Sequence, residues 1–305
     1  MIRAADLHKR YGDLVVLDGL DFEIARGERV AFLGANGAGK TTLFRCLLGL
    51  TDFDGALAVD GHAAGPAGEE VRRRVGYVPQ LPPVYDLSLD GFVDLFAGLR
   101  GVSREAAAER LADLGLSLEE TGGKEMGELS GGMLQKAYLA MALAAETPAL
   151  LLDEPTASLD PASRREFVRL LQEVDGDATM LLASHRLEEI EPLADRLVVL
   201  HRGRIAFDGA LEELWATAGM TAGLWIAAPP AEREALAREL RRNPAVRAVH
   251  PNGTGVRIDA DEADHLDVLE RLRRSDVPVV EFRTRPPALE EVLAKLVGED
   301  GEGPR

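Results

Sequence analysis

Hydrophobic positions in the first 220 residues follow two patterns that alternate along the chain. Short uninterrupted apolar runs, RVAFLG at 29–34, PALLLD at 148–153 and ATMLLASH at 178–185, are separated by stretches in which apolar residues recur every three or four positions. Uninterrupted runs are typical of parallel strands buried on both faces, and the spaced pattern is typical of helices. This part of the chain is predicted to be an α/β domain, with a helical subdomain at about 87–145.

The pattern changes after residue 220. A strand, a helix, a hairpin, a second helix and a strand are expected between 223 and 284, and a final helix at 288–296. Asn252 and Gly253 supply the turn of the hairpin. The order β-α-β-β-α-β predicts a small α+β ferredoxin-like domain. The expected boundaries are 1–220 for the first domain, 221–298 for the second, and 299–305 for a flexible tail.

Composition and charge restrict the classes of partner. The chain has 305 residues, of which 46% are hydrophobic and 29% charged, which is ordinary globular usage and excludes disorder as the main state. The formal net charge is −17, so no long-range field attracts the chain to nucleic acid or to anionic lipid. Cys46 is the only cysteine, which excludes a disulfide framework and indicates the cytoplasm.

No segment is expected to cross a membrane. The uncharged run at 214–231 is diluted by glycine, proline and threonine, and the N-terminus lacks the apolar core of a signal peptide. If the protein acts at a membrane, another chain must supply the membrane part.

A glycine-rich loop, GANGAGKT at 34–41, follows the first apolar run and precedes the apolar stretch at 42–50. This strand, loop and helix order is the context of a phosphate-binding P-loop. Its glycines let backbone N–H groups point at phosphate oxygens. Lys40 is expected to neutralise the β and γ phosphates, and the Thr41 hydroxyl to bind Mg²⁺. The expected nucleotide-binding residues of this loop are Gly34, Asn36, Gly37, Ala38, Gly39, Lys40, Thr41 and Thr42.

The apolar run at 148–153 leads into two adjacent acids, Asp153 and Glu154. If the strand continues through both, their side chains point in opposite directions and are expected to have different roles. We expect Asp153 to hold Mg²⁺ and Glu154 to polarise the water that attacks the γ phosphate. The carboxyl ends of parallel strands carry ligand sites, which favours this interpretation over two solvated acids.

A second phosphate site is predicted at LSGG, residues 129–132. Ser130 can cap the helical run that follows, and Gly131 and Gly132 can bring backbone N–H groups close to an anion. Alone, this motif is more typical of an ordinary helix cap. Beside a P-loop, it favours phosphate binding.

Five motifs together resemble the nucleotide-binding subunits of ABC transporters. They are the P-loop, LSGGM at 129–133, LLLDEP at 150–155, ASLD at 157–160 and ASH at 183–185. The resemblance spans about residues 1–215. It implies a RecA-like P-loop NTPase core with an antiparallel β subdomain and a helical subdomain, in which two cassettes close head to tail over two ATP molecules.

The resemblance also implies roles for single residues. Tyr11 matches the aromatic residue that stacks on adenine, and Val16 matches the apolar residue that packs on the same ring. Gln80 matches the glutamine that contacts Mg²⁺ or the attacking water and reports the nucleotide state to the membrane partner. His185 would hold the γ phosphate and Glu154 in place.

Other matching residues would act across the dimer. Ser130, Gly131 and Gly132 would bind the γ phosphate held by the opposite cassette, and Asp160 would contact the dimer interface. Met133, Lys136 and Ala157-Ser158 depart from the family pattern, but none of these departures removes a residue required for hydrolysis.

The remaining histidines and the cysteine predict no metal site. Cys46 lies among leucines and is expected in the core. The other histidines show no metal-ligand spacing and are expected at the surface. They are His8, His62, His201, His250 and His265.

The expected function is the ATP-hydrolysing subunit of an ABC transporter. A second copy and a separate transmembrane permease are the expected partners, with ATP and Mg²⁺ bound and the chain peripheral on the inner face of the cell membrane. The segment 82–89 looks like the stretch that ABC-2-type exporter ATPases offer to a coupling helix, and the C-terminal domain resembles a tail found in that group, which favours export.

Two alternatives remain. A non-transport ABC protein acting on ribosomes or DNA is disfavoured by a single cassette, the absence of heptads and the net acidity. The ferredoxin-like domain could sense a small ligand or hold the dimer together, and we favour a brace for the dimer because no ligand signature is present. The transported substrate cannot be read from the sequence.

Overall fold

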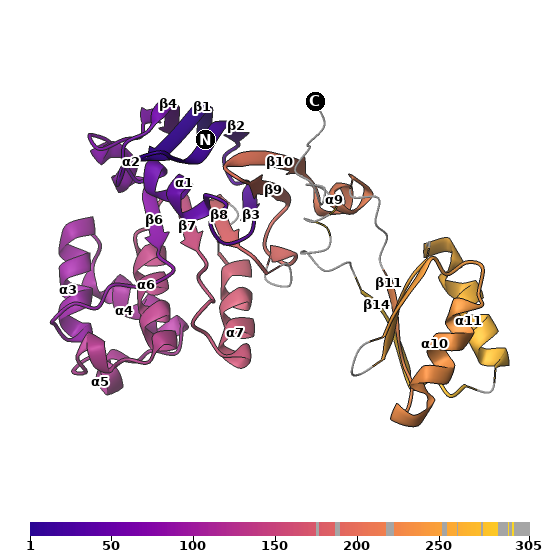
Figure 1. Ribbon diagram of the computed structural model, residues 1–305. Helices are drawn as coiled ribbons and strands as arrows, with labels where there is room; N and C mark the ends of the chain where they lie inside the picture. The colour runs from indigo at the N-terminus through magenta and orange to yellow at the C-terminus, as the bar shows by residue number, and fades with distance from the viewer. Residues whose placement is uncertain are drawn as a thin grey trace. The chain divides into compact units, whose positions relative to one another are not determined.

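The computed structural model describes residues 1–174, 177–186, 190–217, 223–251, 255–260, 262–275, 277–285, 292 and 295. The chain divides into two compact units, Met1–Leu211 and Glu212–Arg305, each with its own hydrophobic core (Figure 1). The division lies earlier in the chain than the expected boundary at 220, because nearly all of helix α9 (Leu211–Thr217) belongs to the second unit. The expected turn at 252–253, the tail and most of the final helix lie outside the described residues.

A mixed sheet of six strands forms the centre of the first unit. Its strands, in spatial order, are β10 (Arg204–Gly209), β9 (Arg196–His201), β3 (Arg29–Leu33), β8 (Thr179–Ser184), β7 (Ala149–Asp153) and β6 (Val75–Val78). All neighbours are parallel except β10 and β9. Every residue of β7 and β8 is buried, which explains their uninterrupted apolar runs. The carboxyl ends of β3, β7 and β8 therefore lie along one edge of the sheet.

A smaller antiparallel sheet packs over this core. Its strands, in spatial order, are β2 (Leu14–Ile24), β1 (Ile2–Tyr11), β4 (Asp54–Val59) and β5 (His62–Ala63). The two sheets and α1 enclose one apolar cluster, in which Phe32 of β3 makes edge-to-face contacts with Phe22 and Phe44 at centroid distances of 5.6 and 6.2 Å. This packing fixes the strand that leads into the glycine loop.

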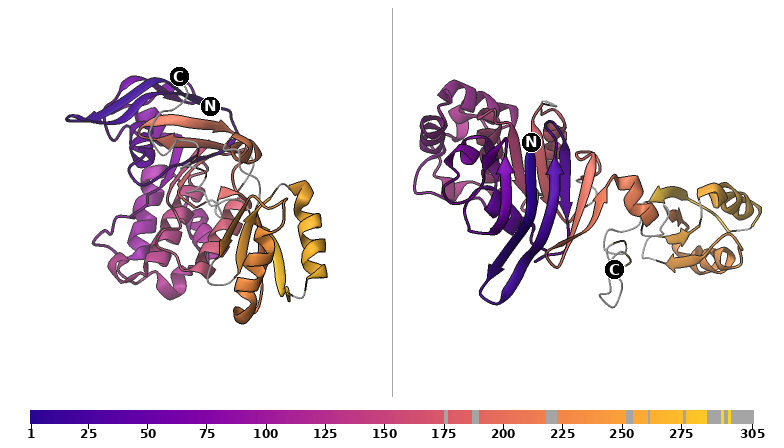
Figure 2. Two further views of the ribbon diagram at one scale, coloured as in Figure 1. Left: turned by 45° about the vertical axis from the view of Figure 1, so that its right-hand side comes forward. Right: turned by 90° about the horizontal axis from the view of Figure 1, so that it is seen from above.

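The described part of the first unit also contains helices. They are α1 (Lys40–Leu47), α2 (Glu69–Arg73), α3 (Leu89–Arg100), α4 (Arg104–Asp113), α5 (Leu118–Thr121), the 3₁₀ turn η1 (Met126–Glu128), α6 (Gly131–Ala144) and α7 (Pro161–Gln172). The helices α3 to α6 gather at the end of the unit opposite the antiparallel sheet (Figures 1 and 2). They form the expected helical subdomain, and serines cap three of them, α3, α4 and α6.

The second unit has ferredoxin-like topology. Its elements are β11 (Gly223–Ala227), η2 (Pro230–Glu232), α10 (Arg233–Arg241), β12 (Ala248–Pro251), β13 (Val256–Asp259), η3 (Glu262–Asp264), α11 (His265–Arg274) and β14 (Glu281–Arg285). The sheet is antiparallel in the order β12-β13-β11-β14, with α10 and α11 on one face (Figure 1). This order is the one that the split βαβ pattern requires, so the predicted fold is confirmed.

Among the described residues, no helix combines the length and the apolar character that crossing a membrane requires.

Candidate nucleotide site

The glycine loop at 34–39 carries the chain from β3 to α1. Gly37 and Gly39 have φ angles of 83° and 111°, a region in which a residue with a Cβ is strained. A Cβ at Gly34 would lie only 2.5 Å from the carbonyl oxygen of Leu200. The loop therefore depends on glycine for its backbone angles at two positions and for close packing at a third.

Lys40 begins α1 and projects a buried ammonium over the loop. Nζ donates to the carbonyl oxygen of Gly34 at 2.6 Å and lies 3.6 Å from Oε1 of Glu154. Burial lowers the pKa of Lys40, and the charges of Glu154 and Asp153 oppose that shift. The result is a fixed cationic group beside two carboxylates.

Asp153 ends β7, and its carboxylate accepts hydrogen bonds from two hydroxyl groups. Thr41 Oγ1 donates to Oδ1 at 3.0 Å, and the Tyr77 hydroxyl donates to Oδ2 at 3.4 Å. Burial raises the pKa of Asp153, while the hydrogen bond from Thr41 opposes that shift. Adjacent carboxylate and hydroxyl oxygens are the donors that Mg²⁺ prefers, so Thr41 and Asp153 fit such an ion.

Glu154 does not continue the strand. Its φ angle is 45°, in the left-handed region, and its N–H donates to the carbonyl oxygen of Ala183 at 2.8 Å. The assumption from the sequence that the strand runs through both acids was therefore wrong, and the strand ends at Asp153 because the backbone turns directly after it. The carboxylate of Glu154 lies between Lys40 and His185, whose Nδ1 is 2.8 Å from Oε2.

Gln80 is exposed on a loop that α6 holds on both sides. Gln135 Nε2 donates to the carbonyl oxygen of Pro79 at 3.2 Å, and the Tyr138 hydroxyl donates to that of Pro83 at 2.8 Å. Gln135 and Tyr138 are three residues apart and therefore share a face of α6. The helix that follows the LSGG motif thus also positions the segment that carries Gln80.

Tyr11 and Val16 lie on the antiparallel sheet, Tyr11 at the end of β1 and Val16 in β2. The Tyr11 ring is 44% exposed, and Nζ of Lys9 lies 4.6 Å from its centroid. That ammonium is also 2.5 Å from Oδ1 of Asp52. The carbonyl oxygen of Val16 is 3.0 Å from the position of a Cβ at Gly39, which places Val16 against the loop.

The LSGG motif forms a separate surface. Ser130 Oγ accepts the N–H of Met133 at 3.2 Å and caps α6, as expected. A Cβ at Gly132 would lie 3.3 Å from Leu159, so the motif packs against the segment before Asp160. Gly131 lies beside it, with its Cβ position 3.6 Å from Ser158.

Asp160 caps α7 and accepts the backbone N–H of Ala162 at 2.9 Å. Hydrogen bonds from the Ser163 hydroxyl and N–H keep the pKa of this carboxylate low. Within the part of the chain that the structure describes, no hydrogen bond or ion pair joins Gln80, Ser130 or Asp160 to the cluster of Lys40, Thr41, Asp153, Glu154 and His185.

Three side chains at this site were not predicted from the sequence. Tyr77 contacts Asp153, Lys9 contacts Tyr11, and Tyr138 holds the loop of Gln80. Lys9 could have been identified, because residues two apart on a strand share a face. Tyr138 is the hydroxyl-bearing residue of a helix whose other polar side chains are Gln135 and Lys136, which is a recognisable signal. Nothing local to the sequence marks Tyr77.

The sequence also predicted the burial of Cys46 and the exposure of His265. Cys46 is fully buried, as predicted, and burial raises the pKa of its thiol to about 11. His265 is only 8% exposed, so its predicted surface position is wrong; it begins α11 and packs inward. Within the described ranges, no three His, Cys, Asp or Glu residues form a cluster that could hold a metal ion.

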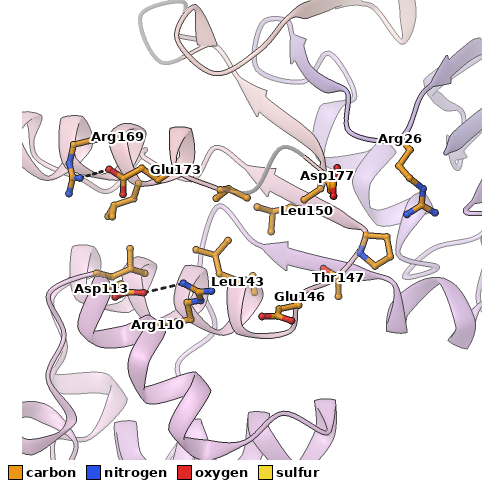
Figure 3. Close-up of a pocket in the computed structure, with 16 residues that line it drawn as sticks. Arg26, Arg110, Asp113, Leu143, Glu146, Thr147, Leu150, Arg169, Glu173 and Asp177 are labelled. Carbon is orange, nitrogen blue, oxygen red and sulfur yellow. Dashed lines mark hydrogen bonds and ion pairs between the residues drawn. The ribbon is translucent and has the colours of Figure 1, made fainter.

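A cleft of about 810 Å³ lies elsewhere in the first unit (Figure 3). Its floor includes Pro148 and Leu150 at the start of β7, and α4 and α7 line opposite walls through Arg110 and Arg169. These positions are at the amino ends of the strands, away from the glycine loop. Parallel sheets place their ligands at the carboxyl ends, so this cleft is distinct from the candidate site.

Known proteins resemble this chain over nearly its whole length. The family model described as ABC transporter matches residues 17–157. A daunorubicin resistance ATP-binding protein, DrrA3, of Streptomyces coeruleorubidus is 36% identical over 96% of this chain and 94% of its own length. A Nod factor export ATP-binding protein I of Burkholderia orbicola is 35% identical over 97% of this chain and 96% of its own.

A solved structure described as the ATP binding subunit of an ABC transporter has a similar fold. It is 31% identical, with a TM-score of 0.65, and the match covers 72% of this chain and 93% of that one.

Proposed function

We propose that this chain, which belongs to the ATP-binding, ATP-hydrolysing subunits of ABC transporters, drives export through a separate membrane permease by closing and opening a dimer of two copies. The observation that carries the proposal is the cluster at the carboxyl ends of β3, β7 and β8. There, Lys40, Glu154 and His185 meet within hydrogen-bond or ion-pair distance, next to a glycine loop.

The chemistry of the proposed site is positioning and electrostatics. Backbone N–H groups of the loop and the N-terminus of α1 would hold the phosphates of ATP, and Lys40 would offset their charge. Glu154, oriented by His185, would position the attacking water and accept its proton. Mg²⁺, when bound, would neutralise phosphate charge, and Thr41 and Asp153 are the residues that would hold it.

A second copy would complete the site. Ser130, Gly131 and Gly132 would form a phosphate-directed surface at the N-terminus of α6, and among the described residues no hydrogen bond or ion pair joins them to the Lys40 cluster. A head-to-tail pair would bring this surface of one copy onto the nucleotide of the other. Two phosphate-directed surfaces in one chain are the feature that supports this arrangement.

The permease would dock beside Gln80. Large apolar side chains are exposed on the loop that follows Gln80 and on α3. They are Leu81, Val84, Tyr85, Leu95 and Leu99. An apolar patch of this kind fits a short helix of a membrane subunit, which would place the chain on the inner face of the membrane.

The test is Glu154→Gln in the purified protein. We expect the variant to bind ATP, to hydrolyse it at least ~100-fold more slowly because the general base is lost, and to accumulate as a dimer with ATP and Mg²⁺. The matched control is Glu146→Gln, since Glu146 is also a glutamate with a left-handed backbone, φ 42°, but lies outside the cluster. Hydrolysis at the wild-type rate by Glu154→Gln would refute the proposed role of Glu154.

A further inference from the structure

The strand β14 forms one edge of the sheet in the second unit. In the part of the chain that the structure describes, β14 pairs only with β11, so its outer N–H and C=O groups have no strand partner there. Phe282 on this strand is 57% exposed, and Val280, which directly precedes the strand, is 70% exposed. The unpaired edge of a strand is a template for pairing with another chain, and charged side chains on that edge restrict which strand can pair with it.

The charges on β14 are complementary to each other. Glu281 and Arg283 are one residue on either side of Phe282, and Arg283 Nε lies 2.5 Å from Oε1 of Glu281. Both point to the face opposite that of Phe282, since side chains alternate along a strand. When two copies of this strand run antiparallel, the acid of each copy can lie opposite the base of the other, and the two aromatic residues can lie opposite each other.

We infer that β14 pairs antiparallel with β14 of a second copy of this chain, about a two-fold axis through Phe282. In that register the two Phe282 rings lie opposite each other, and each Glu281 lies opposite the Arg283 of the other copy. Cross-strand aromatic pairs and opposite-charge pairs stabilise antiparallel strands, each by direct contact. The pairing extends the sheet across the dimer.

The neighbouring registers are unfavourable. A two-fold axis through Glu281 places the two Glu281 side chains opposite each other, and an axis through Arg283 does the same for the two arginines. Like charges directly opposite each other destabilise a strand pair. The charge pattern therefore selects the register centred on Phe282.

This contact needs no nucleotide and does not rest on the proposed ATP-driven dimer. Five residues of strand bury little area, so the association of free copies is weak. The role of the pairing as a tether rests on the proposed function: when two copies bind one transporter, the effective concentration of this contact is high, and a weak pairing is sufficient to hold the two strands together. The second unit thus acts as a tether that keeps the pair together.

The test is disulfide cross-linking of the full chain without nucleotide. Residues directly opposite each other in an antiparallel pair have Cα atoms about 4.5–5.5 Å apart, which is within the Cα range that a disulfide spans, so two copies of Phe282→Cys can be cross-linked. The matched control is Leu266→Cys, a residue of α11 that is 74% exposed. The native Cys46 is buried and contributes no background.

We expect Phe282→Cys to give several-fold more cross-linked dimer than Leu266→Cys. Adding Arg283→Glu should abolish the excess, because Glu then faces Glu, and the double exchange Glu281→Arg with Arg283→Glu should restore it. Equal yields from the two cysteine variants, or no rescue by the exchange, would overturn the inference. Neither result bears on Glu154, so the ATP-driven dimer is judged separately.

Discussion

Among the described residues of the first unit, Glu146 and Glu154 are the glutamates with left-handed backbones, and of these two Glu154 belongs to the cluster with Lys40 and His185. A non-glycine residue in that region costs on the order of 1 kcal/mol and persists when its surroundings fix it. At Glu154, the hydrogen bond to Ala183 and the contacts with Lys40 and His185 supply that constraint. The turn after Asp153 brings the carboxylate of Glu154 to Lys40 and His185, whereas Asp153 accepts hydrogen bonds from Thr41 and Tyr77.

A buried residue also predicts a pH dependence. The Cys46 thiol keeps its proton up to a pKa of about 11 in the native state, whereas a thiol in the unfolded chain ionises near pH ~8.5–9. Between these values the unfolded state binds fewer protons, so the free energy of unfolding falls by up to ~1.4 kcal/mol per pH unit. Below that window the contribution of Cys46 is fully present.

The measurement is urea unfolding of wild type and Cys46→Ala at pH 8 and pH 10. Wild type should lose about 1 kcal/mol more than Cys46→Ala between the two pH values. Cys46→Ala is less stable at both, because it leaves a small cavity, but that cost cancels in the comparison. Equal losses would contradict the assigned ionisation.

At the scale of elements, the strands with uninterrupted apolar runs could be predicted, because burial on both faces leaves no room for polar side chains. The glycine loop could be predicted too, since its backbone angles require glycine. The turn at Glu154 could not, because no neighbouring residue encodes a left-handed glutamate. The position of the Gln80 loop could not be predicted either, because it depends on contacts between distant residues. Gln135 binds Pro79, 56 positions away, and Tyr138 binds Pro83, 55 positions away.

The helix α6 therefore connects the LSGG motif at its N-terminus with the Gln80 loop through the side chains of Gln135 and Tyr138. Tyr138→Phe removes the hydroxyl that binds the Pro83 carbonyl but keeps the ring, which contacts Phe92 at a centroid distance of 5.0 Å. We expect the free energy of unfolding to fall by about 1 kcal/mol, the value of one hydrogen bond, and ATP hydrolysis to slow with ATP affinity unchanged.

The comparison for this prediction is Tyr138→Leu, which removes the aromatic contact as well and should be less stable than Tyr138→Phe. Calorimetry and steady-state kinetics provide the two measurements. If Tyr138→Phe hydrolyses ATP as fast as wild type, the hydroxyl does not position the Gln80 loop.

At the scale of the whole molecule, two cores mean two units of folding. The first core is built from both sheets and α1, and the second from β11, β13, α10 and α11. Separate cores predict two thermal transitions. ATP with Mg²⁺ should raise only the transition of the first unit, by about 2.7 kcal/mol of stabilisation when ATP is at 100 times its Kd.

Variants of buried core residues show, in calorimetry, which thermal transition belongs to which unit. Leu151→Ala should lower only the transition that ATP raises, and Leu236→Ala only the other, each by about 2–5 kcal/mol, because both side chains are fully buried. A single transition that responds to both variants would contradict two independent units.

The cleft in Figure 3 has one further use. Its walls are α4 and the end of α6 on one side and α7 on the other. The other end of α6 starts at Ser130, the residue proposed to meet the nucleotide of a second copy. If α6 moves as a rigid body when a second copy contacts Ser130, the wall of the cleft at Ala142 and Leu143 moves with it. Spin labels at Arg110 of α4 and Arg169 of α7 would measure the width of the cleft during ATP turnover, from a surface away from the glycine loop.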